Sequence, residues 1–112
     1  MIEATILNCI ENCTGIPAFT EMPENPPDTL AIVERIGGTL NEHIYHSIIA
    51  VKSYAPFLLD AAQNCELIQQ ALIYQMVNED DVIKVTLNSA SNNTDEFTKS
   101  PRYQALFEIA HY

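Results

Sequence analysis

The cysteine and histidine side chains of this sequence have a spacing that could hold a metal ion. Cys9 and Cys13 lie four positions apart in a predicted helix, and His43 and His46 lie three positions apart. Thiolates and imidazoles at such spacings can share a zinc ion. However, no paired CxxC or HExxH motif accompanies them, and free cysteines on an apolar helix stripe are usually buried. We therefore interpret Cys9 and Cys13 as core residues and predict no metal site.

Catalytic combinations are not recognisable in the sequence either. No nucleophile and base can be paired from it, and it contains neither a GxGxxG nor a GxxxxGK[ST] phosphate-binding loop. Cys65 lies on the apolar stripe of a second predicted helix and is also interpreted as core. The acidic residues 79–81 and 95–96 are interpreted as solvated turns and loops. We predict that the protein is not an enzyme and needs no cofactor.

Two arginines are candidates for an ion pair, and the chain has only 5 Lys and Arg residues in total. Arg35 and Arg102 each lie near the end of a predicted strand, beside a loop. Each could form a salt bridge at the sheet edge with one of the many acidic residues, or an ion pair between subunits. Isolated surface ion pairs are common and contribute little to stability. The sequence leaves both interpretations open.

Length, composition and charge limit the classes of protein that this chain can be. Its 112 residues suffice for a single domain, 1–112, and 47% hydrophobic residues can build a core without disulfides. Three cysteines, an odd number, favour a reducing compartment. The net charge of −10 opposes binding to nucleic acid and to anionic membranes. This charge fits a soluble protein or a surface along which DNA slides without binding. No apolar run is long enough to span a bilayer, and the first residues lack the basic segment of a secretory signal.

Residues 30–38, LAIVERIGG, are predicted to form a strand that the other segments of the chain pair with or cover. Apolar and β-branched residues occupy both alternating positions at its start, which favours a strand covered on both faces and therefore central in its sheet. Gly37 and Gly38 predict that this strand ends in a turn. A polar turn over 39–43 then leads to a second strand, 44–54, paired antiparallel with the first.

The remaining segments are assigned from the period of their apolar residues. They are helices over 1–14 and 57–76, a weak edge strand over 16–22, a proline-rich connector over 23–28, strands over 82–88 and 102–112, and a long polar loop over 89–101. Together they predict an α+β fold, a two-layer sandwich. Its mainly antiparallel sheet has four to five strands, and two helices cover one face.

Several short motifs occur in a distinctive order: GIPAFTEMPENPPDTLAIVERIGG, then VKSYA, an Ala-rich helix, and finally SPRYQALFEIAHY. This order resembles the tail terminator family of long-tailed bacteriophages, whose members are also called tail completion or head–tail joining proteins. The matching positions are Pro17, Pro23, Pro27, Glu34, Gly37, Gly38, Tyr54, Ala55, Ala61, Pro101, Arg102, Tyr103 and Gln104. One departure is the start of the long helix, where the family commonly has aromatic-Ala-Ser-Arg and this chain has an aromatic-Ala-Pro-Phe sequence.

The resemblance implies a structural protein of the virion tail or neck, encoded by a phage or prophage and assembled in the bacterial host cytoplasm. Such proteins form rings, typically hexamers, on the end of the finished tail tube. The ring stops polymerisation of the tube protein and joins it to the head–tail connector protein, while DNA passes through without being bound. The alternative is a small ligand-binding or regulatory α+β domain with a pocket between helices and sheet.

A ring requires a head-to-tail interface that closes on itself. The exposed sheet edges and the two loops at strand ends are the candidates for this interface. The residues predicted to form it are Arg35, Gly37, Gly38, Asn41, Glu42, Asp95, Glu96, Arg102 and Tyr103.

Overall fold

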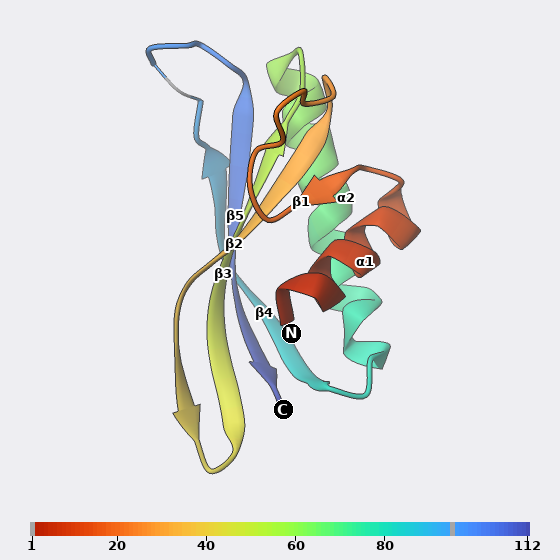
Figure 1. Cartoon of the computed structure of the whole chain (residues 1–112), viewed down its shortest axis with the longest axis vertical. Coiled ribbons are helices and arrows are strands. Elements are labelled where there is room, and N and C mark those ends of the chain that lie inside the picture. Colours follow the sequence, from red (N-terminus) through yellow and green to blue (C-terminus); the bar gives the residue numbers. More distant parts are fainter. Residues whose placement is uncertain (1, 95) are drawn as a thin grey trace.

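A computed structural model describes residues 2–94 and 96–112 and confirms the predicted α+β class (Figure 1). One five-stranded sheet has the order β1-β2-β3-β5-β4, and two helices pack together on one of its faces. Only β1 and β2 are parallel; the other neighbours are antiparallel. The elements are α1 (Ile2–Thr14), β1 (Ala18–Phe19), β2 (Leu30–Asn41), β3 (Ile44–Tyr54), α2 (Leu58–Tyr74), a 3-10 turn (Met76–Asn78), β4 (Val82–Asn92) and β5 (Arg102–His111).

The core lies between the helices and the sheet. Ile6 and Ile10 of α1 and Ile68 and Leu72 of α2 point toward it, and Phe107 of β5 is fully buried at its centre. The predicted apolar stripes of both helices are therefore correct in these positions. None of the helices in the described ranges has the length and apolar character needed to span a bilayer.

The prediction that the strand at 30–38 is central and ends at its glycines is wrong. β3 is the middle strand of the sheet, and β2 continues through both glycines to Asn41. A β-bulge between Arg35 and Gly37 absorbs one extra residue, and the hairpin turns at residues 42–43, both with positive φ. β1 pairs with β2 only near its start, so the second half of β2 has no neighbour on that side and is exposed.

The strand predicted over 82–88 is also longer than expected and contains two bulges. Because the first bulge lies between Val82 and Lys84, Val82 points into the core and is 7% exposed, whereas Ile83 is 42% exposed. The alternation of apolar residues predicted Ile83 on the inner face, together with Val85 and Leu87. This would hold for a strand without a bulge, but the bulge shifts Ile83 to the other face. β4 extends to Asn92, so the predicted long loop over 89–101 shortens by four residues.

Two further boundaries differ from the prediction. The weak strand over 16–22 reduces to the two residues of β1, at the predicted sheet edge. The long helix begins at Leu58, and its N-cap residue Phe57 makes no side-chain capping bond. The helix was predicted over 57–76 and is shorter at both ends, because it ends at Tyr74.

Candidate functional site

The structure divides the predicted interface residues between opposite ends of the sheet. Five of them lie in β2 and its hairpin turn: Arg35, Gly37, Gly38, Asn41 and Glu42. Glu96, Arg102 and Tyr103 lie at the other end, where β5 begins beside the end of β3. Asp95 lies outside the described residues. Arg35 lies nearest to the second group, because it pairs with Ile49, four residues before the Ser53 that pairs with Tyr103.

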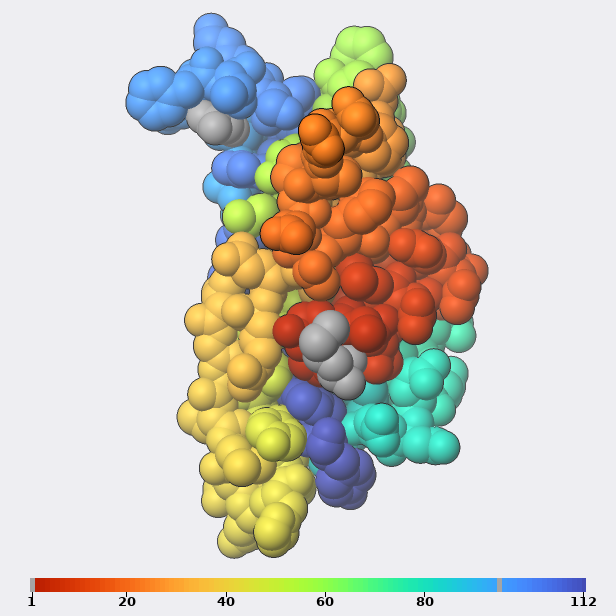
Figure 2. Space-filling model, viewed as in Figure 1, coloured from red at the N-terminus to blue at the C-terminus, as the bar shows by residue number. Residues whose placement is uncertain are grey.

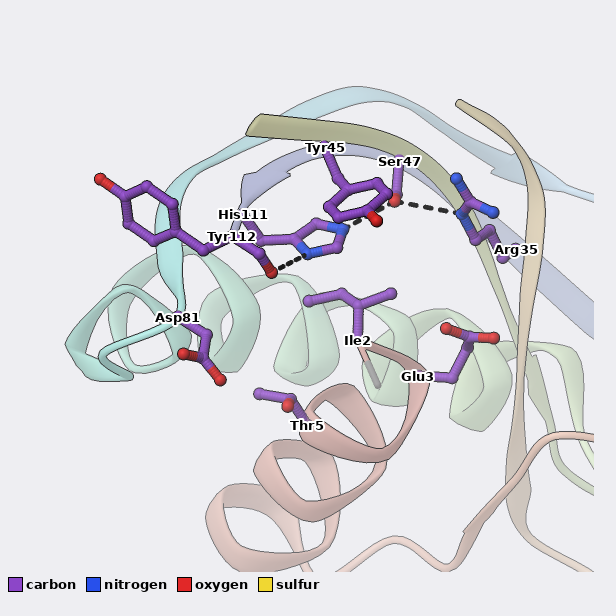
Figure 3. Close-up of a pocket in the computed structure, with 9 residues that line it drawn as sticks. All are labelled: Ile2, Glu3, Thr5, Arg35, Tyr45, Ser47, Asp81, His111 and Tyr112. Carbon is purple, nitrogen blue, oxygen red and sulfur yellow. Dashed lines mark hydrogen bonds between the residues drawn. The ribbon is translucent and has the colours of Figure 1, made fainter. Parts of the chain in front are cut away.

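A chain of hydrogen bonds joins three strands at the hairpin end (Figure 3). The Nε of Arg35 in β2 donates to the Ser47 Oγ in β3 over 3.1 Å, and this Oγ lies 2.8 Å from Nε2 of His111 in β5. The Nδ1 of His111 lies 3.2 Å from the main-chain oxygen of Tyr112. Because that oxygen can only accept, Nδ1 carries a hydrogen in this contact, and in that tautomer Nε2 can accept from the Ser47 hydroxyl.

This network lines a cleft of about 420 Å³ between α1 and the hairpin end of the sheet. The ring of Tyr45 stacks on His111 with a centroid distance of 5.3 Å. Ile2, Glu3 and Asp81 also line the cleft. It therefore combines one guanidinium, two carboxylates and aromatic surface in a small space.

The contact between Ser47 and His111 resembles a nucleophile beside its base, but Ser47 is 0% exposed. An attacking hydroxyl must be accessible to its substrate, and here both neighbours of the hydroxyl are protein groups. The arrangement instead holds the guanidinium of Arg35 in one orientation. The linear sequence gives no signal for this pair, because its members are 64 residues apart.

Gly38 makes space for this arginine, and Gly37 does not. Gly38 has φ +153°, and an added Cβ would lie 2.5 Å from the His46 main-chain oxygen and 2.7 Å from Nη2 of Arg35. A Cβ on Gly37 would meet only a side-chain carbon of Ile48, at 3.9 Å. The glycine pair of the sequence motif therefore contains one position that the bulged backbone requires and one that it does not.

At the other end of the sheet, Arg102 is held by neutral groups. Its Nε donates to the Asn93 main-chain oxygen over 2.7 Å and its Nη1 to the Tyr54 hydroxyl over 3.2 Å, with the guanidinium 5.6 Å from the Tyr54 ring centre. A cleft of about 520 Å³ adjoins it, lined largely by proline and apolar side chains. Arg102 thus closes one side of an apolar cleft.

Neither arginine forms the predicted salt bridge at the sheet edge. Within the described ranges, Lys52 forms an ion pair with Glu34 at 3.5 Å, and Nδ1 of His46 lies 3.7 Å from the carboxylate of Glu108. The expectation of a sheet-edge salt bridge is therefore wrong for Arg35 and Arg102 among these residues. The other interpretation, an ion pair between subunits, stays a prediction.

The three cysteines do not share one environment. Cys9 and Cys65 are buried, as predicted, but Cys13 is exposed, so its assignment to the core is wrong. Cys13 falls in the last turn of α1, where the groove between the helices opens. Residues 2–94 and 96–112 contain no group of three or more His, Cys, Asp and Glu side chains that could hold a metal ion.

Thiol labelling should distinguish these cysteines. Burial raises the pKa of the Cys9 thiol to about 12, with a further contribution from Cys13, and burial also raises the pKa of Cys65. Because the thiolate is the reactive form, iodoacetamide at pH 8 should modify one thiol per folded chain, at Cys13. Mass spectrometry after digestion identifies the position, and urea-unfolded protein should give three modified thiols. Rapid labelling of Cys9 in the folded protein would contradict this assignment.

The same Cys9 shift predicts a loss of stability at alkaline pH. An unfolded Cys9 ionises near the usual pKa of 9.0, whereas the folded thiol stays protonated until about pH 12. Between these values the unfolded state binds fewer protons, so the free energy of unfolding falls as pH rises. Cys9→Ser, followed by urea titration at pH 8 and pH 10, should lose most of this dependence.

Two serines of β3 provide a test of the network. Ser47→Ala should lower the free energy of unfolding by about 1–2 kcal/mol, because the buried His111 loses its partner. Ser53 is the matched control: it is also buried, on the same strand, and its Oγ has no hydrogen-bond partner among the described residues. Ser53→Ala should be neutral or slightly stabilising. Equal effects of both substitutions in urea unfolding would show that the network contributes nothing to stability.

All Lys and Arg residues lie outside the helical layer of the fold. Neither helix contains a Lys or Arg, whereas both carry acidic residues: Glu3 and Glu11 on α1, Asp60 and Glu66 on α2. The basic residues lie on the strands or in the loop before β5. The helical layer is therefore uniformly acidic.

Comparison with known proteins was made on sequence and on structure. No known family matches the sequence, and no curated protein does. Among solved structures, the chain is similar to one from the virion of a native gene transfer agent (GTA) particle, with a TM-score of 0.65. The alignment covers 98% of this chain and 93% of that one. This fold occurs in a virion.

The GTA virion chain shares the architecture of this protein but few of its residues. Sequence identity between the two is 13%, so the likeness establishes the fold alone. Because the alignment covers 98% of this chain, the sheet and both helices belong to the shared architecture. The arginine network and the acidic helical layer rest on this chain's own residues.

Proposed function

We propose that the protein is a structural virion protein that caps the phage tail tube as a ring. In this role it ends tube polymerisation and forms the joint to the head connector. The observation that carries the proposal is the similarity, over nearly the whole chain, to a chain of the GTA virion. The motif order that resembles tail terminators supports the finer assignment. The proposed partners are further copies of this chain, six in a ring, the tube protein and the connector protein.

The charge distribution supports a role in which DNA passes and is not bound. A net charge of −10 repels phosphate, and the helical layer contains no basic residue. Full burial of Ser47 supports a protein without catalysis, since the one nucleophile–base contact described above is closed to substrate. Assembly would take place in the host cytoplasm and the product would reside in the virion.

A small ligand-binding or regulatory domain is the second candidate. The clefts of about 420 and 520 Å³ favour it, because they have the size of small-molecule sites and each contains an arginine. This function predicts a monomer or dimer that gains thermal stability with a specific small ligand.

Light scattering across a concentration series tests the proposal first. A ring of six protomers of 12.5 kDa has a mass of about 75 kDa, and this species should appear as concentration rises. Electron microscopy should then show rings on the ends of purified tail tubes. A protein that stays monomeric and leaves tube ends bare at saturating concentration would contradict the proposal. Stabilisation of such a monomer by a small ligand would support the second candidate.

A further inference from the structure

The β2–β3 hairpin has an apolar surface at its outer end that no residue in 2–94 or 96–112 covers. Leu40 pairs directly with Tyr45, so both side chains lie on the same face of the sheet as Ser47 and His111. The helices cover this face elsewhere, but the hairpin extends beyond the helical layer (Figures 1 and 2). Leu40 is 59% exposed and Tyr45 is 41% exposed. We call Arg35, Leu40 and Tyr45 the hairpin patch.

Arginine and tyrosine surrounded by apolar side chains are typical of the residues that dominate protein interfaces. The patch has this composition, and its arginine is held in place before any partner binds. Arg35 uses Nε for Ser47, which leaves the outer edge of the guanidinium for a carboxylate. Glu3 and Asp81 line the same cleft, but neither forms an ion pair with Arg35. The patch therefore fits a surface that is apolar and acidic.

The outer side of α2 is such a surface. Leu59, Leu67 and Tyr74 recur at two-turn spacing, so they form one stripe, and all three are exposed. Asp60 lies seven residues before Leu67, and Glu66 seven residues after Leu59, which places a carboxylate on each border of the stripe. Buried α2 residues lie on the opposite side of the helix. We call these five residues the helix stripe.

We propose that the hairpin patch of one protomer docks on the helix stripe of a second copy of this chain. The neighbour's α2 would then extend the helical layer over the uncovered end of the hairpin. Apolar side chains meet apolar side chains, and Arg35 meets the carboxylates Asp60 or Glu66. The two surfaces are different parts of the molecule, so the contact is head-to-tail and can close into a ring. This inference rests on the proposed ring function and names its interface.

A mixing experiment tests this contact. Leu40→Glu disables the hairpin patch and Leu67→Glu the helix stripe, and each should weaken self-association by at least about 30-fold, the size of an interface hot spot. Each variant keeps one intact surface. An equimolar mixture should therefore form a dimer, twice 12.5 kDa, and nothing larger. Circular dichroism and thermal unfolding of both variants should first show that the two exposed positions tolerate glutamate. Ile83→Glu, at an exposed position on the free edge of β4, is the matched control and should assemble like wild type.

The outcomes separate the interface from the function. If both variants assemble like wild type, if their mixture forms no dimer, or if only Ile83→Glu blocks assembly, the proposed interface is wrong. The wild-type protein could also cap tubes while its copies make no contact with each other, either in solution or after cross-linking on the tube. That result would contradict the proposed interface and would still support the proposed function. Self-association through these surfaces by a protein that never caps tubes supports the interface and contradicts the function.

Discussion

Gly38→Ala should lower the free energy of unfolding by about 3 kcal/mol in urea titration. The backbone at φ +153° is unfavourable for a residue with a side chain, and such strain costs about 1–3 kcal/mol. The new methyl group would also lie 2.5 Å from the His46 main-chain oxygen, which belongs to the paired strand and cannot rotate away. Nη2 of Arg35 would have to move as well, so the arginine network should loosen.

Gly37→Ala is the control for this prediction. Its added Cβ meets one side-chain carbon at 3.9 Å, an ordinary van der Waals distance. Replacing glycine at a permissive position reduces the entropy of the unfolded chain. This variant should therefore have a free energy of unfolding equal to that of wild type or higher by up to about 0.5–1 kcal/mol. If the two variants unfold at the same urea concentration, the bulge does not impose the strain that we assign to Gly38.

Phe107→Ala should have the largest effect on stability of any substitution considered for this protein, about 4 kcal/mol. Phe107 is fully buried at the centre of the core, in β5 between Ile49 of β3 and Leu87 of β4. Removing a buried aromatic ring loses its transfer free energy and leaves a cavity, and such changes cost about 3–5 kcal/mol. A loss of this size is a large part of the stability of a domain of about 100 residues.

Phe57→Ala removes the same side chain from an exposed position immediately before α2. It should change the free energy of unfolding by about 0.5 kcal/mol or less. Equilibrium urea unfolding of both variants, followed by circular dichroism, makes the comparison. A loss below about 1.5 kcal/mol for Phe107→Ala would mean that the core closes over the vacated space or is not centred on this ring.

The two layers of the fold are predictable because their signals are local. A helix repeats its buried side every 3.6 residues and a strand every two, and these periods in α1, α2 and β5 matched the structure. Strand order is different, because it depends on which edges meet in space. The apolar run at the start of β2 indicated burial on both faces but could not show that β3 would take the central position.

The candidate site was predictable only in part. Arg35 and Gly38 were singled out from the sequence, and the structure explains both through the bulge that lies between Arg35 and Gly37. Ser47 and His111 were not, because nothing in a linear sequence indicates that residues 64 positions apart hydrogen-bond.

The sequence by itself determined the element types, the strong acidity and the absence of basic residues from both helices, since these follow from composition and local periodicity. The tertiary structure alone decided that the hairpin extends beyond the helical layer. It also decided that Arg35 is oriented by a serine and a histidine from two other strands. These features depend on strand register and on the bulges, and one inserted residue changes which side chains share a face.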